Sequence, residues 1–123
     1  PAQIEALLKQ CPLIGQACVV GDGRPHVGAL IVPDPDAARV WAAHHGSKGA
    51  SMADLAGRAD FQAEITTFVD RANQQLAPAE RIAAFEIIGE EWLPDSDVLT
   101  PTAKLKRRGI SHRYARIIDG LYS

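Results

Sequence analysis

The sequence predicts an α+β fold, a small layered domain in which helices flank a sheet of about three strands. The first observation is size, since 123 residues make one ordinary domain that can bury a core. The second is composition, because 46% hydrophobic and 23% charged residues are typical of a soluble globular protein. The third is the arrangement of apolar residues, because short continuous apolar runs, which are typical of strands, alternate along the chain with segments whose apolar residues recur at helical spacing. No run approaches the ~18 residues that span a bilayer.

The first third of the chain predicts a short helix and an antiparallel hairpin. The helix is expected first, because Pro1 precedes apolar residues at helical spacing. Residues 17–20 and 26–32 are apolar enough for strands, and the Gly- and Pro-containing segment 21–25 joins them. The sequence therefore predicts a hairpin over residues 17–32.

The middle of the chain carries two helix signals. Residues 34–36 (Asp-Pro-Asp) form a helix start with an acidic cap and a proline in the first turn, and this helix is expected to end near Gly46. A polar segment with one short helix follows at 47–57. The most regular stripe then begins at Asp60. Its apolar residues fall at helical spacing: Phe61, Ile65, Phe68, Val69, Ala72 and Leu76.

The last third predicts one more strand and a final helix. Residues 82–88 are largely apolar, so we expect a third strand that is covered on both faces. An acidic loop follows at 90–101. The final helix should turn Arg113 and Arg116 outward and carry one apolar stripe: Ile110, Tyr114, Ile117, Ile118 and Leu121.

Several motifs that resemble ligand-binding or metal sites are better explained as turns or packed side chains. Residues 21–23 (Gly-Asp-Gly) lead into a strand rather than a helix N-terminus, so we expect a turn and not a phosphate loop. His44 and His45 point about 100° apart on a helix and have no third ligand nearby, so no metal site is expected. Trp41 and Trp92 could stack on a base or ring, but we expect core or edge packing. Cys11 and Cys18 could pair, but we expect two buried, reduced thiols.

Charge is distributed unevenly along the chain. The whole chain has a net charge of −2, but residues 98–123 hold six cations against Asp119, which leaves −7 on residues 1–97. A basic end on an acidic body predicts an anionic partner: nucleic acid, a membrane surface, a phosphate-bearing substrate or an acidic protein face. A solvated helix end explains the same charges without a partner. Nucleic acid is disfavoured, because no aromatic residue is interleaved with the basic run.

The densest part of the basic end is residues 99–108, Leu-Thr-Pro-Thr-Ala-Lys-Leu-Lys-Arg-Arg. It predicts a loop that runs into a helix, with Lys104 at the junction as a mobile point charge suited to a phosphate and a carboxylate. The segment resembles the last signature of the adenylate-forming synthetases, and specifically the long-chain fatty-acid–CoA ligase form, Leu-Thr-Pro-Thr-x-Lys-Leu-Lys-Arg. The general family pattern has glycine where this chain has Ala103.

The resemblance extends over nearly the whole chain. Residues 1–5 resemble the segment after the family's interdomain hinge, residues 12–21 resemble the helix end and strand that follow, and residues 114–122 resemble the C-terminal helix. The family's hinge and large N-terminal domain, with its phosphate loop, substrate pockets and Mg²⁺ carboxylate, have no counterpart in residues 1–123. We therefore expect a single C-terminal domain that is inactive by itself.

The resemblance implies a lid domain of a bacterial, cytoplasmic long-chain fatty-acid–CoA ligase. Such an enzyme converts fatty acid, ATP and CoA into acyl-CoA, AMP and pyrophosphate. Lys104 matches the catalytic lysine of the adenylation step, after which the domain rotates and presents another face to CoA. Thr102, Lys106 and Arg107 are expected to contact substrate. ATP and Mg²⁺ are expected to bind mainly to the N-terminal domain in cis, with no metal ligand in this domain.

Three other functions stay open at this point. The domain of a fatty-acyl-AMP ligase would hand its acyl group to a carrier protein instead of CoA, although the Thr-Pro-Thr-x-Lys-Leu-Lys-Arg form argues against it. A stand-alone module could bind an acyl adenylate or a carrier protein. A nucleic-acid-binding domain would use the basic end, and we expect no such partner. We expect no transmembrane segment, and any peripheral contact with a membrane would be made by the full-length enzyme.

Overall fold

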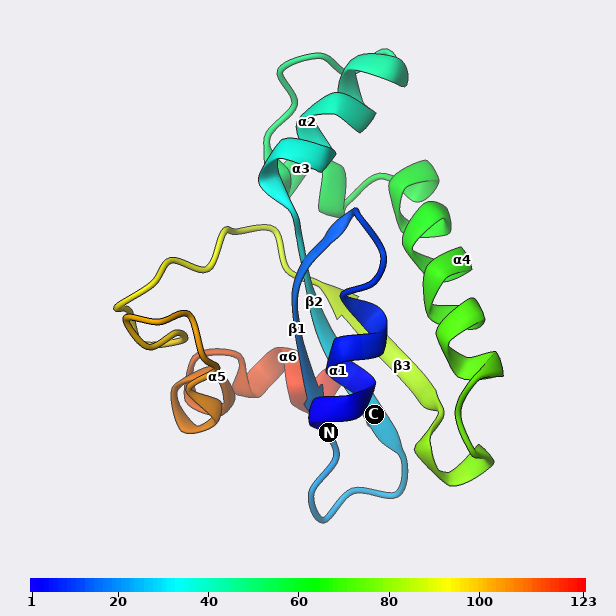
Figure 1. Cartoon of the computed structure of the whole chain (residues 1–123), viewed down its shortest axis with the longest axis vertical. Helices are drawn as coiled ribbons and strands as arrows, with labels where there is room; N and C mark the ends of the chain where they lie inside the picture. Colours follow the sequence, from blue (N-terminus) through cyan, green and yellow to red (C-terminus); the bar gives the residue numbers. More distant parts are fainter.

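A mixed three-stranded sheet in the order β1-β2-β3 forms the centre of the computed structural model, which describes all 123 residues (Figure 1). β1 (Ile14–Val20) and β2 (Val27–Pro33) form an antiparallel hairpin, with Cys18 opposite Leu30. β3 (Ile82–Ile87) pairs with β2 in the parallel direction. The predicted α+β class, hairpin and third strand are confirmed, although β1 begins at Ile14 rather than at residue 17.

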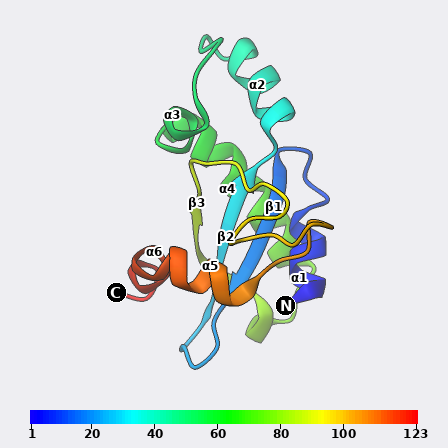
Figure 2. The same cartoon turned by 90° about the vertical axis from the view of Figure 1, so that its left-hand side faces the viewer.

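Helices lie on both sides of this sheet (Figures 1 and 2). α1 (Ala2–Leu8) and α4 (Ala59–Gln74) cover one face. α5 (Arg107–Arg113) and α6 (Ala115–Gly120) lie on the opposite face. The remaining helical segments are α2 (Pro35–His44) and α3 (Met52–Ala56), which extend past the end of the sheet, and the 3-10 turn η1 (Pro78–Glu80) before β3.

The face under α1 and α4 holds the larger of two hydrophobic clusters. The predicted stripe of α4 is confirmed, since Phe61 and Ile65 are completely buried there. α2 also begins where its sequence signal predicts, because the carboxylate of Asp34 accepts the N–H of Ala37 at 2.9 Å. Tertiary packing of such stripes supplies most of the stability of helices this short.

The opposite face of the sheet holds a second cluster. Cys18 and Leu30 point into it from the strands, and Trp92 closes it from the loop after β3. The indole Nε1–H of Trp92 donates to the hydroxyl of Tyr114 at 2.8 Å, which satisfies a polar group that burial would otherwise leave without a partner. Because clusters cover both faces, every residue of β2 except Val27 is buried.

Two expectations about the last third of the chain are wrong. β3 is an edge strand, and Ala83 and Glu86 are exposed, because the sheet ends there and the helices cover it only in part. The final helix is divided into α5 and α6 at Tyr114, whose backbone (φ −108°, ψ 25°) leaves the helical region. The change of direction brings Ile110 and Ile118 into the second cluster but leaves Ile117 37% exposed.

Candidate functional site

The basic segment forms a tight loop that projects from the second cluster. Leu99 and Leu105 form an antiparallel bridge, and the N–H of Thr100 donates to the carbonyl of Lys104 at 2.8 Å. One residue further from the tip on each side of this bridge, the N–H of Lys106 donates to the carbonyl of Val98 at 2.9 Å. Because Val98 and Leu99 are buried, the two ends of the loop are fixed to the body of the domain.

Thr100 organises the tip of the loop. Its hydroxyl oxygen accepts the N–H of Lys104 at 3.0 Å and lies 3.3 Å from the hydroxyl of Thr102, while its carbonyl accepts the N–H of Ala103 at 2.9 Å. Ala103 adopts a left-handed backbone (φ 62°), which turns the chain toward Lys104. The backbone around Lys104 is therefore closely defined.

The side chain of Lys104 is the free cation of this loop. It is exposed and makes no hydrogen bond or ion pair within the domain. It borders a groove of about 350 Å³ whose other wall is α1 with Lys9, the residue that follows α1, and which is also lined by Gln16 and Ala17 of β1. Thr102 is exposed beside it on the same tip. A fixed backbone with a free ammonium is suited to contact an anion that arrives from outside the domain.

The two other predicted site residues are engaged within the domain. The ammonium of Lys106 donates to the carbonyl of Ser96 at 2.9 Å. Arg107 donates through both terminal nitrogens to the carboxylate of Glu5, at 2.7 and 2.8 Å. The structure thus places all four predicted residues in or beside one loop, but only Lys104 and Thr102 have side chains free of partners outside that loop.

The Glu5–Arg107 pair is the feature of this site that sequence reasoning missed. Glu5 is the only buried charged residue, and its carboxylate also accepts the N–H of Val19 at 2.7 Å. The hydrogen bonds to Glu5 are the main cause that raises the pKa of Arg107. A signal was present, since Glu5 lies one helical turn before Leu8 on the buried side of α1.

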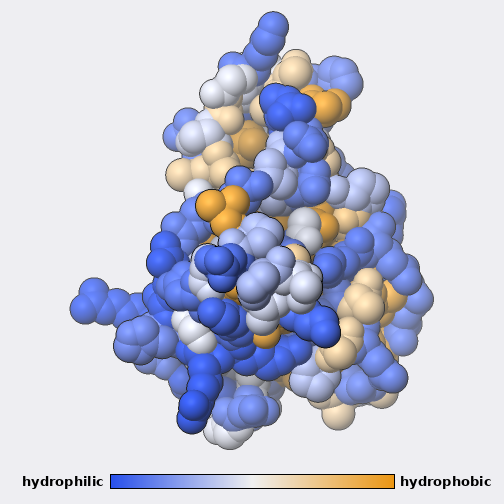
Figure 3. Space-filling view, turned by 60° about the vertical axis from the view of Figure 1, so that its left-hand side comes forward, coloured by the Kyte–Doolittle hydropathy of each residue, from blue (hydrophilic) through white to orange (hydrophobic).

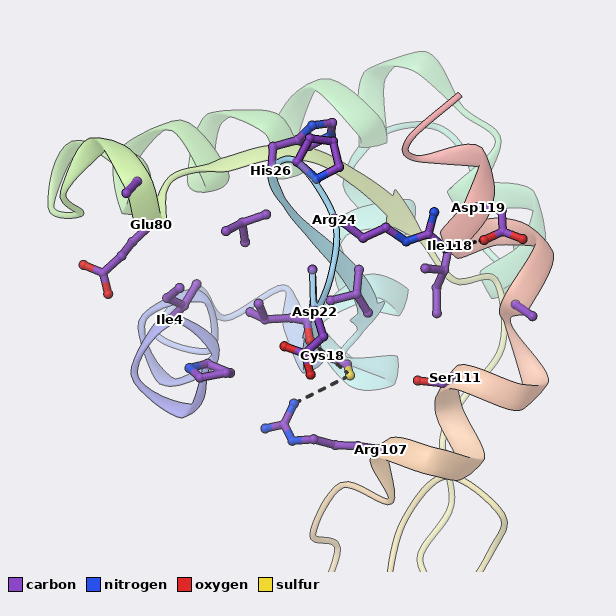
Figure 4. A pocket seen from close by; sticks show the side chains of 18 residues that line it. Ile4, Cys18, Asp22, Arg24, His26, Glu80, Arg107, Ser111, Ile118 and Asp119 are labelled. Carbon is purple, nitrogen blue, oxygen red and sulfur yellow. Dashed lines mark hydrogen bonds and ion pairs between the residues drawn. The ribbon is translucent and has the colours of Figure 1, made fainter.

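A larger groove of about 650 Å³ is also lined by Arg107 and lies between the hairpin, α1 and the last two helices (Figure 4). The guanidinium of Arg107 approaches the Sγ of Cys18 at 4.0 Å there. Burial is the main cause that raises the pKa of Cys18 to about 11, so this thiol stays protonated at neutral pH. The other arginine of the groove, Arg24, is paired with Asp119. Both arginines of this groove are therefore paired within the domain, whereas Asp22 and Glu80, which also line it, form no ion pair.

A second ion-pair network holds the loop that precedes Lys104. Arg113 of α5 donates to Glu90 at 2.9 Å and to Asp97 at 3.2 Å, and the hydroxyl of Tyr114 donates to Glu90. These hydrogen bonds, chiefly those from Arg113, hold the pKa of Glu90 below its usual value. The surface over α5 and this loop is predominantly hydrophilic (Figure 3).

No other chemistry is apparent in the remaining candidates. His45 stacks on Trp41 with ring centroids 3.8 Å apart and bonds through Nδ1 to the carbonyl of Trp41 at 2.7 Å. The chain has no group of three or more His, Cys, Asp or Glu side chains placed to hold a metal ion. None of its helices combines the length and apolar character that a membrane crossing needs. Trp41, Trp92, Cys11 and Cys18 are all buried, as predicted, and both cysteines are free thiols.

Comparison with known proteins assigns this arrangement to a family. The model of the AMP-binding enzyme C-terminal domain matches residues 1–123. This chain belongs to that family. The match covers all of the described residues, and the resemblance seen in the Leu99–Arg107 segment is confirmed at the level of the family.

Curated relatives of this AMP-binding enzyme C-terminal domain are much longer proteins. It is 41% identical over 124 residues to the long-chain-fatty-acid–CoA ligase FadD15 of Mycobacterium tuberculosis, covering 100% of this chain and 21% of that protein. A putative fatty-acid–CoA ligase, fadD11, of the same species is 40% identical, with 22% of its length covered. The chain therefore spans about a fifth of the length of these relatives.

Solved structures show the same fold. The adenylation domain of a carboxylate reductase from Mycobacterium chelonae superposes with a TM-score of 0.74 at 21% identity, over 98% of this chain and 17% of that one. The adenylation domain of a carboxylic acid reductase from Segniliparus rugosus, in complex with AMP and a co-purified carboxylic acid, gives 0.73 at 23% identity over 98% of this chain and 17% of that one. At these identities the likeness concerns the fold.

Proposed function

We propose that this chain is the lid domain of an ATP-dependent long-chain fatty-acid–CoA ligase and supplies Lys104 to its adenylation step. The observation that carries the proposal is the free ammonium of Lys104 at the tip of a loop whose backbone is fixed by hydrogen bonds. The similarity to FadD15 over the full chain supports the choice of reaction.

The chemistry follows from the charges that adenylation brings together. The fatty carboxylate attacks the α-phosphorus of ATP, so two anions must approach and negative charge accumulates on the phosphoryl oxygens. The ammonium of Lys104 bridges the carboxylate and the α-phosphate and offsets this charge, and the hydroxyl of Thr102 donates a further hydrogen bond. Pyrophosphate leaves, and acyl-AMP is formed.

The partner groups are supplied by the rest of the enzyme. The N-terminal domain in cis binds ATP, the fatty acid and Mg²⁺, as the family resemblance implies. In the second step CoA displaces AMP, and the lid rotates so that Lys104 leaves the reacting centre. Lys106 is retained as a proposed substrate contact, for which its ammonium would leave the carbonyl of Ser96, whereas Arg107 stays paired with Glu5.

The acceptor is tested directly with the complete ligase and ready-made palmitoyl-AMP. We expect rapid formation of palmitoyl-CoA when CoA is offered, and little transfer when a phosphopantetheinylated carrier protein is offered at the same concentration. The opposite preference would identify the enzyme as a fatty-acyl-AMP ligase.

The isolated 123-residue chain, mixed with ATP and palmitate, should release no pyrophosphate above a blank.

A further inference from the structure

The carboxylate of Glu5 joins three parts of the domain at one point. It lies on α1, it accepts the N–H of Val19 in the edge strand β1, and it receives both terminal nitrogens of Arg107. Glu5 is only 7% exposed, so these charge-assisted hydrogen bonds operate in a poorly hydrated place where they are strong. A planar guanidinium held at two points also has a defined orientation.

The position of Arg107 in the chain connects this point to the site. Arg107 is the first residue of α5 and follows Lys104 by three positions. The start of α5 has no side-chain cap, since Lys106 at that position makes no capping hydrogen bond. The ion pair is therefore the side-chain contact that fastens the exit of the Lys104 loop to α1, which forms the opposite wall of the groove that Lys104 borders.

We propose that Glu5 and Arg107 act as one positioning pair that sets the distance and direction of Lys104 relative to α1, and that Arg107 does not bind substrate. The proposal rests on the lid function of Lys104 given above. A substrate anion that recruited Arg107 would have to leave Glu5 buried with a charge and one remaining donor, the N–H of Val19. Such a loss is much more costly than leaving an exposed cation free.

The test uses the complete ligase and measures its two half-reactions separately in single turnovers. The variants are Arg107→Gln, Glu5→Gln, the double variant and Arg107→Lys, with Arg108→Gln as the matched control because Arg108 is an exposed neighbour without an ion pair. We expect Arg107→Gln to lower the rate of acyl-AMP formation about 10- to 100-fold, because misplacing a catalytic group by about 1 Å has effects of this size. The KM values for ATP and fatty acid should stay within about twofold, since no substrate contact is lost.

Three further results follow if the two residues act as a unit. The double variant loses no more activity than either single variant, because removing one partner already releases the other. Arg107→Lys loses an intermediate amount, since it keeps the charge but not the two-point contact. Thioester formation from supplied acyl-AMP stays within about threefold in every variant, and Arg108→Gln matches the unaltered enzyme in both steps.

Different outcomes would overturn the proposal in recognisable ways. A raised KM with an unchanged rate constant, or losses that multiply in the double variant, would show that Arg107 contacts substrate. Equal losses in both half-reactions would show a purely structural role. Arg107→Gln leaves Glu5 as a buried charge, so circular dichroism checks that each single variant folds, and the double variant, which has no such charge, replaces any that does not. Hydrogen exchange then decides: loss of the pair should accelerate exchange of the Lys104 amide at least about tenfold, and unchanged exchange would contradict the positioning role.

Lys104→Ala separates this proposal from the one on which it rests. If Lys104→Ala leaves acyl-AMP formation unchanged, the proposed function itself is wrong. If Lys104→Ala abolishes that step while Arg107→Gln leaves it intact, Lys104 is catalytic and only the positioning role fails.

Discussion

At the scale of single residues, Ala103 occupies a conformation that glycine adopts more readily. Its φ of 62° places a Cβ in the left-handed region, which costs roughly 1–2 kcal/mol for a residue other than glycine. The loop accepts this conformation because it turns the chain so that Thr100 can bond the N–H of Lys104. The orientation of Lys104 is thus obtained at a local cost in stability.

Ala103→Gly should therefore stabilise the domain. We expect the free energy of unfolding to rise by about 0.5–1 kcal/mol, because relief of the strained backbone exceeds the added entropy of the unfolded chain. The matched control is Ala83→Gly on the exposed side of β3, which should lower stability by about 0.5–1 kcal/mol. Urea unfolding of the 123-residue chain measures both, and a loss of stability in Ala103→Gly would contradict the argument.

At the scale of elements, the packing of α5 against the preceding loop depends on a glycine. A Cβ built on Gly109 would lie 1.8 Å from the carbonyl oxygen of Asp97, which is far inside van der Waals contact. The helix can approach the loop this closely only without a side chain at that position. The same approach lets Arg113 reach both Glu90 and Asp97.

Gly109→Ala should destabilise the domain by at least about 2 kcal/mol, although glycine-to-alanine changes in helices normally stabilise. A Cβ built on Gly120 in α6 would meet no atom within 4 Å, so Gly120→Ala should leave the free energy of unfolding unchanged or raise it by up to about 1 kcal/mol. Thermal unfolding followed by circular dichroism compares the two. Equal effects of the two substitutions would mean that α5 does not pack as described.

The network at Glu90 predicts how stability responds to acid. Because Arg113 and Tyr114 hold the pKa of Glu90 below its usual value of 4.5, the unfolded chain binds more protons than the folded one in this range. The contribution of Glu90 is therefore complete above that value and is lost as the pH falls through the lower folded pKa. Glu90→Gln should lower stability at neutral pH by no more than about 1 kcal/mol, since the pair is half-exposed.

Urea unfolding at several pH values between about 2 and 7 measures this effect. The difference between the unaltered chain and Glu90→Gln should shrink as the pH falls below 4.5. Asp36→Asn is a suitable control, because Asp36 forms only an exposed pair with Arg39. A difference that stays constant with pH would show that Glu90 contributes through packing and not through its charge.

At the scale of the whole molecule, two clusters share one sheet. Cys11 lies in the cluster under α1 and α4 and Cys18 in the cluster under α5, so each thiol reports on one side of the domain. They are 6% and 3% exposed. If the two clusters form one cooperative unit, both cysteines should become accessible in the same transition.

Alkylation tests this cooperativity. We expect iodoacetamide to leave Cys11 and Cys18 unmodified in the folded chain at pH 8 and to modify both at the same urea concentration. Reducing agent should leave the melting temperature unchanged, because both cysteines are free. Modification of Cys18 well before Cys11 would show that the side of the domain carrying the Lys104 loop opens independently.

Local patterns predicted those parts of the molecule that local chemistry determines. The capping residue Asp34 predicted α2, the stripe of apolar residues predicted α4, and the apolar run at 26–32 predicted β2. The parallel direction of β3 was not predicted, because an apolar run does not specify the strand with which it pairs. Lys104 was found through its motif, whereas the Glu5–Arg107 pair beside its loop joins residues 102 positions apart. Helical spacing indicated that Glu5 lies on the buried side of α1 but did not indicate its partner.

The central claim is that Lys104 serves the first half-reaction and not the second. The measurement is a pair of single turnovers on Lys104→Ala in the complete ligase, with Arg108→Ala as the control. We expect acyl-AMP formation to slow by about two to three orders of magnitude, since one donor aimed at developing charge is worth about 3–4 kcal/mol. Thioester formation from supplied acyl-AMP should stay within about threefold of the unaltered enzyme, and Arg108→Ala should change neither step. Equal losses in both steps, or a normal rate of acyl-AMP formation, would contradict the account.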